Sequence, residues 1–272
     1  MSSSSPGLRP EQVPASLVAR LPEGFELRPA RHGNSSTVAF VGGGDESLVL
    51  KCATAPPYLG WLRVEAEVLQ RLADTELPVP EVVAAEQGPD GVWLLLRRLP
   101  GEPLCDVLPR EPADSSAWLQ RAGVLLGRIH TTPVPRELLD RDSTPWWQRP
   151  RVDLPSSSGG EVLGASRLAG DPPPAVFVHG DFTLDNVLAG DGRLTGVVDW
   201  GGAGRGDPRY DLALALLSAG GGTTLPAADA VQAFYAGYLE AVAGHPALHD
   251  SIAEALSSKT QPPGAVESEP GD

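Results

Sequence analysis

Three oxygen-bearing side chains stand at fixed intervals within residues 176–216. Asp181 and Asn186 lie five residues apart in the sequence HGDFTLDN, and Asp199 follows thirteen residues later in DWG. Between them, VLAGDGRLTGVVDW has two apolar runs around Gly-Asp-Gly, a pattern typical of a β-hairpin. Such a hairpin turns the chain back on itself and would bring Asp199 close to Asn186. This spacing constrains the fold more than any other feature of the chain.

The chemistry of these side chains favours phosphoryl transfer. Transfer from ATP needs a carboxylate that orients the attacking hydroxyl and accepts its proton, and further oxygen ligands for Mg²⁺. The interval in H-G-D-x-x-x-x-N is that of the protein-kinase catalytic loop, and Asp-Trp-Gly aligns with Asp-Phe-Gly. We therefore expect Asp181 to be the catalytic base, and Asn186 and Asp199 to be the magnesium ligands.

The first hundred residues have the pattern of a small antiparallel sheet that carries one helix. The β-branched runs 37–41 and 47–52 flank a glycine-rich turn, and EVVAAEQ and VWLLLRR flank Gly-Pro-Asp-Gly, so each pair predicts a hairpin. Apolar residues at roughly helical spacing within 59–73 predict a helix between the two hairpins. After residue 100, helical patterns at 117–130, 207–217 and 227–242 predict a mainly α region. The fold class is therefore α+β.

Together these features resemble the aminoglycoside phosphotransferases, a family of small-molecule kinases with a protein-kinase-like fold. The resemblance covers residues 20–245 and follows the order of the family along the chain. The catalytic loop of the family corresponds to His179–Asn186, its second metal aspartate to Asp199, and its GD-x-x-x-DLA helix start to Gly206–Ala213. RLPGEPL resembles the segment that joins the two lobes, and LLGRIH resembles the helix that follows.

The resemblance implies a bilobal protein-kinase-like fold. We expect an N-terminal nucleotide-binding lobe at 15–99, a small antiparallel sheet with one helix. A larger, mainly α lobe at 100–257 would carry catalysis and substrate binding. The Ser- and Pro-rich residues 1–14 and the polar, acidic residues 258–272 are expected to be disordered tails.

Lys51 is placed to contact the phosphates of a nucleotide. It closes an apolar strand pattern and is one of only two lysines in the chain. An ammonium there could reach the α- and β-phosphates of ATP, while a helical glutamate would hold it as an ion pair. Glu65 is the expected partner, because it stands four residues before Leu69 as in the E-x-x-x-L helix of the family. Glu67, nearly on the opposite face of the helix, is the alternative.

Two further parts of a nucleotide site are implied by the resemblance. Backbone groups of the connection between the lobes, at Arg97, Arg98 and Leu99, would bind adenine. The turn HGNSST would lie over the phosphates, with Ser35 or Ser36 offering a hydroxyl. Ordinary turn residues explain the same letters equally well.

Other polar residues near the motif have ordinary structural interpretations. His179 is expected to steer the catalytic loop, and His130 to be a satisfied histidine at a helix end. Asp207 is interpreted as an N-cap, and Asp211 as a first-turn acid favoured by the helix dipole. The pair Trp146 and Trp147 lies in a stretch with little periodicity, where it either lines a substrate pocket or fixes the loop to the core.

Composition excludes several classes of protein. The chain of 272 residues has 35 acidic and 21 basic side chains, a formal charge of -14 that argues against a general nucleic-acid binder. No apolar run is long enough to cross a bilayer, and the first residues lack a secretory pattern, so we expect a cytoplasmic protein without a membrane partner. Its two cysteines build neither a disulfide framework nor a CxxC zinc site. The P-loop, G-x-S-x-G and HExxH motifs are absent.

The sequence thus predicts an ATP- and Mg²⁺-dependent O-phosphotransferase, a monomer or weak dimer, acting on a small hydroxylated acceptor. Only a few residues separate Asp199 from the helix start at Asp207, which leaves no room for a long activation segment and disfavours protein substrates. The acidic helical region suits a cationic acceptor such as an aminoglycoside, although solubility explains the charge equally well. A metabolite kinase for an amino alcohol, sugar or homoserine-like substrate is the alternative, and a catalytically silent nucleotide-binding protein is disfavoured.

Overall fold

The computed structural model describes residues 7–30, 36–42, 48–56, 58–133, 174–219 and 228–257. Ser35 and the pair Trp146 and Trp147 lie outside the described residues, as do both the turn around residue 44 and the expected tail at 258–272. Within the described part, no helix combines the length and the apolar character that crossing a membrane requires.

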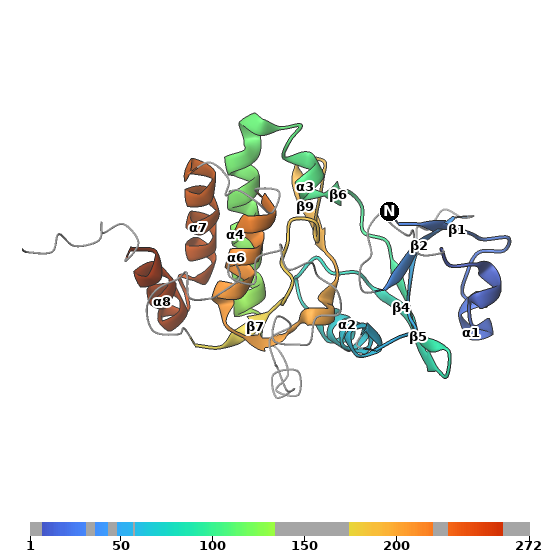
Figure 1. The fold of residues 1–272 in the computed structure, drawn as a ribbon. Coiled ribbons are helices and arrows are strands. Elements are labelled where there is room, and N and C mark those ends of the chain that lie inside the picture. Colours follow the sequence, from blue (N-terminus) through green and yellow to red (C-terminus); the bar gives the residue numbers. More distant parts are fainter. Residues whose placement is uncertain are drawn as a thin grey trace, which may run out of the picture.

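The N-terminal lobe is one antiparallel sheet with a helix on one face (Figure 1). Its strand order is β1-β2-β3-β5-β4. The elements are β1 (Glu26–Pro29), β2 (Thr37–Gly42), β3 (Leu48–Ala53), α2 (Tyr58–Leu72), β4 (Val82–Gly88) and β5 (Gly91–Arg97). Both predicted hairpins and the predicted helix are confirmed. The edge strand β1 was not predicted from the sequence.

Side chains alternate along β5, and this central strand is buried on both faces of the sheet. Trp93 and Leu95 join a small apolar cluster that includes Val13 and Leu17. Leu94 and its neighbours on the opposite face join the main core, to which α2 contributes the apolar side of its helix. Burial of both faces accounts for the unbroken apolar sequence of this strand.

The amino-terminal boundary of the folded lobe differs from the expectation. Residues 1–14 were expected to form a disordered tail, but the structure has a 3-10 helix at Pro10–Gln12 and a helix α1 at Ala15–Val18. Val13 between them is only 7% exposed and packs in the small cluster on the sheet. The expectation was wrong for residues 7–14, because Leu8 and Val13 pack in the apolar cluster on the sheet and hold this segment against it. Residues 1–6 of the expected tail lie outside the described residues.

The chain passes from one lobe to the other between β5 and the short strand β6 (Glu102–Pro103), as the resemblance of RLPGEPL implied. β6 pairs with β8, which belongs to the second lobe. The other elements of that lobe are α3 (Leu104–Val107), a 3-10 helix (Pro112–Asp114), α4 (Ser115–Thr131), β7 (Val176–Val178), β8 (Val187–Gly190), β9 (Arg193–Val197), η5 (Trp200–Gly202), β10 (Gly204–Gly206), α6 (Pro208–Ala219), α7 (Ala228–Val242) and α8 (Pro246–Ser257). Figure 1 shows α4, α6 and α7 side by side as the body of this lobe.

The helical lobe also contains a small β-hairpin of β8 and β9, which connects Asn186 to the segment that contains Asp199. The turn between β8 and β9 is Asp191-Gly192, with φ angles of 51° and 71°. Two successive positive φ angles define a type I′ turn, for which Asp-Gly is a favoured sequence. The three predicted helices are confirmed with shifted ends, whereas α8 was not predicted. The fold class is α+β, as expected.

Candidate active site

Residues 179–186 form a compact loop between β7 and β8 that presents Asp181 and Asn186. The Thr183 N–H donates to the Asp181 carbonyl at 2.7 Å, and the Asn186 N–H donates to the Thr183 carbonyl at 3.0 Å. Gly180 has a φ of 77°, and a Cβ at this position would lie 2.2 Å from the Gly202 carbonyl oxygen. Only glycine allows the loop to approach η5 so closely.

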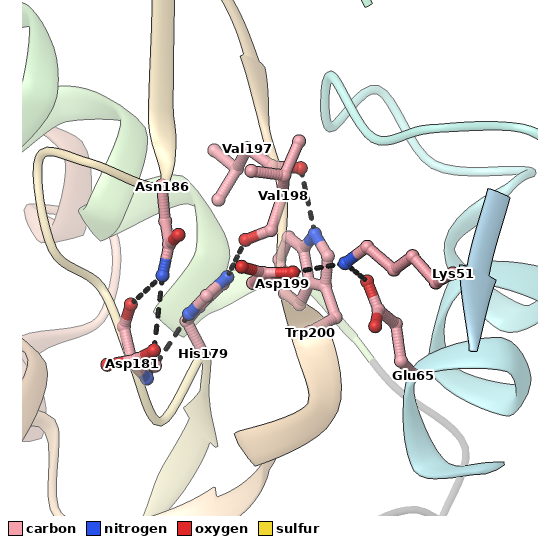
Figure 2. A network of polar contacts seen from close by, with 9 residues as sticks. All are labelled: Lys51, Glu65, His179, Asp181, Asn186, Val197, Val198, Asp199 and Trp200. Carbon is pink, nitrogen blue, oxygen red and sulfur yellow. Dashed lines mark hydrogen bonds and ion pairs between the residues drawn. The ribbon is translucent and has the colours of Figure 1, made fainter. Parts of the chain in front are cut away.

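The side chain of Asn186 is oriented by Asp181. Its Nδ2 donates to the Asp181 carbonyl at 2.9 Å and to the Asp181 carboxylate Oδ2 at 3.2 Å. The residue is 8% exposed, so few other orientations are open to it. Because both bonds use the amide nitrogen, the amide oxygen Oδ1 points away from Asp181, where it is available as a ligand for a cation (Figure 2).

The β8–β9 hairpin brings Asp199 beside this loop, as its sequence predicted. Val187 pairs with Val197, and the Val198 N–H donates to the backbone carbonyl of Asn186 at 2.9 Å. Asp199 adopts a left-handed backbone with φ 65°. Its side chain is 49% exposed, so the carboxylate can still meet a ligand from solvent. Figure 2 shows Asp199 between the loop and the N-terminal lobe.

His179 connects the loop of residues 179–186 to Val198, which precedes Asp199. The Asp181 N–H donates to His179 Nδ1 at 3.2 Å, so this nitrogen carries no proton. The proton is therefore on Nε2, which donates to the Val198 carbonyl at 3.0 Å. Burial lowers the pKa of His179, which favours this neutral form. The expected steering role fits this geometry.

Lys51 on β3 and Glu65 on α2 meet as an ion pair, as predicted. The Lys51 Nζ lies 2.6 Å from the Glu65 Oε1, and both residues are only 4% exposed. Lys51 also forms an ion pair with Asp199, which links the two lobes. Burial alone would lower the pKa of Lys51, but the carboxylates of Asp199 and Glu65 raise it above its ordinary value. The lysine therefore stays charged.

The charges around Asp181 suit a cation. Burial, and then the charges of Asp199 and Asp211, raise the pKa of Asp181 to about 8, although its hydrogen bond from Asn186 opposes this shift. Negative charge at this place is thus unfavourable until positive charge arrives. Within the described residues no group of three His, Cys, Asp or Glu could hold a metal ion alone. A Mg²⁺ ion would fit the oxygens of Asn186 and Asp199 only with further ligands, such as the phosphates of ATP.

Asp211 anchors the loop of residues 179–186, a role that was not predicted from the sequence. Its carboxylate accepts the backbone N–H groups of His179 at 2.8 Å and Gly180 at 3.0 Å. It is 0% exposed and also lies 3.3 Å from Nε2 of His130, whose Nδ1 is 2.8 Å from the Tyr238 hydroxyl. The interpretation of Asp211 as a first-turn acid was therefore incomplete. The available signal was a carboxylate at the start of the apolar run DLALALL, because a helix that is apolar on all sides is expected to be buried together with its acid.

The three residues expected to bind adenine, Arg97, Arg98 and Leu99, make different contacts in the structure. The Arg97 N–H already donates to the Glu81 carbonyl at 2.9 Å, so it is not free for a ligand. The guanidinium of Arg98 lies 4.5 Å from the centroid of the Phe40 ring. Leu99 packs against Gly196 in β9 and so lies at the junction of the lobes.

Ser36, expected to contact the phosphates, directly precedes β2.

Comparison with known proteins connects this geometry to a family. The model of the phosphotransferase enzyme family matches residues 26–249. An aminoglycoside 3'-phosphotransferase of Salmonella typhimurium is 27% identical over 157 residues, 51% of this chain and 56% of that protein. A homoserine kinase of Pseudomonas aeruginosa is 31% identical over 171 residues, 55% of this chain and 51% of that protein. The match spans about half the length of these curated relatives.

A solved structure extends the likeness over nearly the whole chain. The crystal structure of an aminoglycoside-3'-phosphotransferase of type VIII has a TM-score of 0.65 and 27% identity, and the match covers 88% of this chain and 96% of that chain. Sequence and fold thus agree over both lobes. The chain belongs to the phosphotransferase enzyme family.

Proposed function

We propose that the protein transfers a phosphoryl group from ATP to a hydroxyl of a small molecule. The observation that carries the proposal is the convergence of Asp181, Asn186 and Asp199 opposite a buried Lys51. These positions come from both lobes, and a structural role alone does not account for a charged lysine buried between two carboxylates.

The side chains have separate parts in the reaction. Asp181 orients the acceptor hydroxyl and accepts its proton as the oxygen attacks phosphorus. Asn186 and Asp199 would hold Mg²⁺, which when bound offsets the negative charge of the phosphates. Lys51, held by Glu65, would contact those phosphates. The backbone of Leu99 and the carbonyl of Arg97 are proposed for adenine, and the hydroxyls of Ser35 and Ser36 for the phosphates.

We propose a cationic antibiotic of the aminoglycoside type as the acceptor. The formal charge of -14 favours attraction of a polycation, and the relatives include aminoglycoside phosphotransferases in sequence and in structure. A metabolite kinase is the second candidate, because a homoserine kinase matches a similar share of the chain at higher identity. Either reaction uses ATP, which agrees with the expected cytoplasmic location.

The test is a panel assay for ADP release with the purified protein, ATP and Mg²⁺. The panel contains aminoglycosides, other hydroxylated antibiotics, homoserine, amino alcohols and sugars. Acceptor-dependent ADP release, with phosphate found on the acceptor by mass spectrometry, is the expected result. Transfer to an aminoglycoside supports the first candidate, and transfer to a metabolite alone supports the second. Absence of transfer to every class, with a protein that binds Mg-ATP, would favour a silent nucleotide-binding protein.

A further inference from the structure

We propose that Ser218, in the last turn of α6, is a positioning residue that holds the loop between Asp181 and Asn186 in its working geometry. The part of this inference that concerns turnover rests on the proposed function. Its structural part, the anchoring of Leu184 by the Ser218 hydroxyl, can be tested without any substrate.

The Ser218 hydroxyl is fixed by two hydrogen bonds. It donates to the Ala215 carbonyl at 2.9 Å and accepts the Leu184 N–H at 2.8 Å. A hydroxyl can donate only one hydrogen bond, and here the Ala215 carbonyl accepts it. The lone pairs of the oxygen are thereby directed toward Leu184, so the helix presents a fixed acceptor to the loop.

Ser218 and Asp211 hold the loop from the same face of one helix. They are seven residues apart in α6, which is about two turns and about 10 Å along the helix axis. Asp211 accepts the N–H groups at the start of the loop, including that of Gly180, and Ser218 accepts the N–H of Leu184. Asp181 lies between these two attachment points. The rigid helix therefore sets the separation of the two sides of the loop.

The position of the Leu184 peptide affects the positions of Asp181 and Asn186. Its side chain is 0% exposed, and its carbonyl accepts the Cys105 N–H at 3.3 Å. The preceding residue, Thr183, is bonded through its backbone to both Asp181 and Asn186. A shift of the Leu184 peptide therefore displaces the proposed base and one proposed metal ligand together.

Two substitutions at residue 218 separate a hydroxyl effect from a general packing effect. Ser218→Ala removes the acceptor for Leu184, and Ser218→Thr keeps it. The control is Thr132→Ala, which also removes a hydroxyl at a helix end, where it donates to the Arg128 carbonyl at 2.6 Å. We expect Ser218→Ala to lower kcat about tenfold while KM for ATP changes less than about twofold, because a misplaced base slows chemistry more than binding. Ser218→Thr should recover most of the turnover, and Thr132→Ala should keep it.

Amide hydrogen exchange tests the anchoring directly in the protein without substrate. Ser218→Ala should speed exchange of the Leu184 amide by about tenfold or more, since a lost hydrogen bond lowers local protection. Ser218→Thr should leave it near the wild-type rate. Ser218→Cys, with a weak acceptor of similar size, replaces the alanine variant if that variant does not fold.

The outcomes distinguish this inference from the proposed function. Unchanged exchange at Leu184 in Ser218→Ala would overturn the inference, whatever the acceptor is. So would wild-type kcat in that variant, or a threonine variant as slow as the alanine variant. A wild-type protein that transfers no phosphate would instead overturn the proposed function, and the exchange result would still decide whether Ser218 anchors the loop.

Discussion

The two sides of the candidate site are held in place by different kinds of interaction. On the C-terminal side, hydrogen bonds to the backbone fix the loop around Asp181, with Asp211 and His179 as the main partners. On the N-terminal side, ion pairs with Glu65 and Asp199, which are also hydrogen bonds, fix the buried end of Lys51. The loop is therefore assembled without ligands, whereas the link between the lobes is an ion pair for which Mg²⁺ and phosphates would compete.

The largest effect on stability is expected on the side that depends on charge. Lys51→Met leaves the carboxylate of Glu65 buried without its partner, which should cost about 3–5 kcal/mol of unfolding free energy. Urea denaturation measures this loss. The double variant with Glu65→Gln should recover a large part of it, because no uncompensated charge remains. Additive losses in the double variant would show that the pair is not coupled as described.

The next largest effect is expected on turnover, with little change in folding stability. Asp181→Ala should lower kcat by at least about a hundredfold, the scale of losing a general base, while the melting temperature stays nearly constant. The control is Asp191→Asn, at a turn position with φ 51° that asparagine tolerates, and it should keep normal turnover. Retained turnover in a folded Asp181→Ala protein would remove this residue from its proposed role.

Loss of the proposed metal ligand Asp199 should remove the stabilisation of the protein by Mg-ATP. Wild-type protein at a hundredfold excess of Mg-ATP over its Kd should gain about 2.7 kcal/mol of stability. Asp199→Ala should abolish this gain in a thermal-shift measurement, and EDTA added to the wild-type protein should reproduce the effect. If the variant is stabilised as strongly as the wild type, Asp199 is not a ligand.

The smallest effect is expected deep in the helical lobe. Tyr238→Phe leaves Nδ1 of His130 without its partner, which should cost about 1–2 kcal/mol of unfolding free energy and lower kcat only a few-fold. Tyr235→Phe, on the same helix, is the control. Equal losses in both variants would mean that removing either hydroxyl has the same cost, and that the bond to His130 does not determine the effect.

The same division explains what the sequence could predict. Asp181, Asn186 and Asp199 are joined by one hairpin with a clear Asp-Gly turn, so local spacing sufficed to bring them together. Lys51 and Glu65 belong to neighbouring elements, and the resemblance to a family supplied their pairing. For these residues, side-chain type and interval carry the information.

The residues that were not predicted bind backbone N–H groups of residues far away in the sequence. Asp211 and Ser218 bind backbone N–H groups more than thirty residues away, and no side-chain pattern marks those partners. The edge strand β1 and the helix α8 were missed because β1 is short and exposed and α8 lies beyond the last expected helix. The sequence likewise did not indicate that the Arg97 N–H donates to the Glu81 carbonyl and so is not open to adenine.

The most direct test of the account is a crystal structure of the protein with Mn²⁺ and a non-hydrolysable ATP analogue. We predict an anomalous peak about 2.1 Å from Asn186 Oδ1 and from a carboxylate oxygen of Asp199, in contact with phosphate oxygens, with Lys51 Nζ within hydrogen-bond distance of the phosphates. A metal peak away from Asn186 and Asp199, or phosphates that do not approach Lys51, would contradict it.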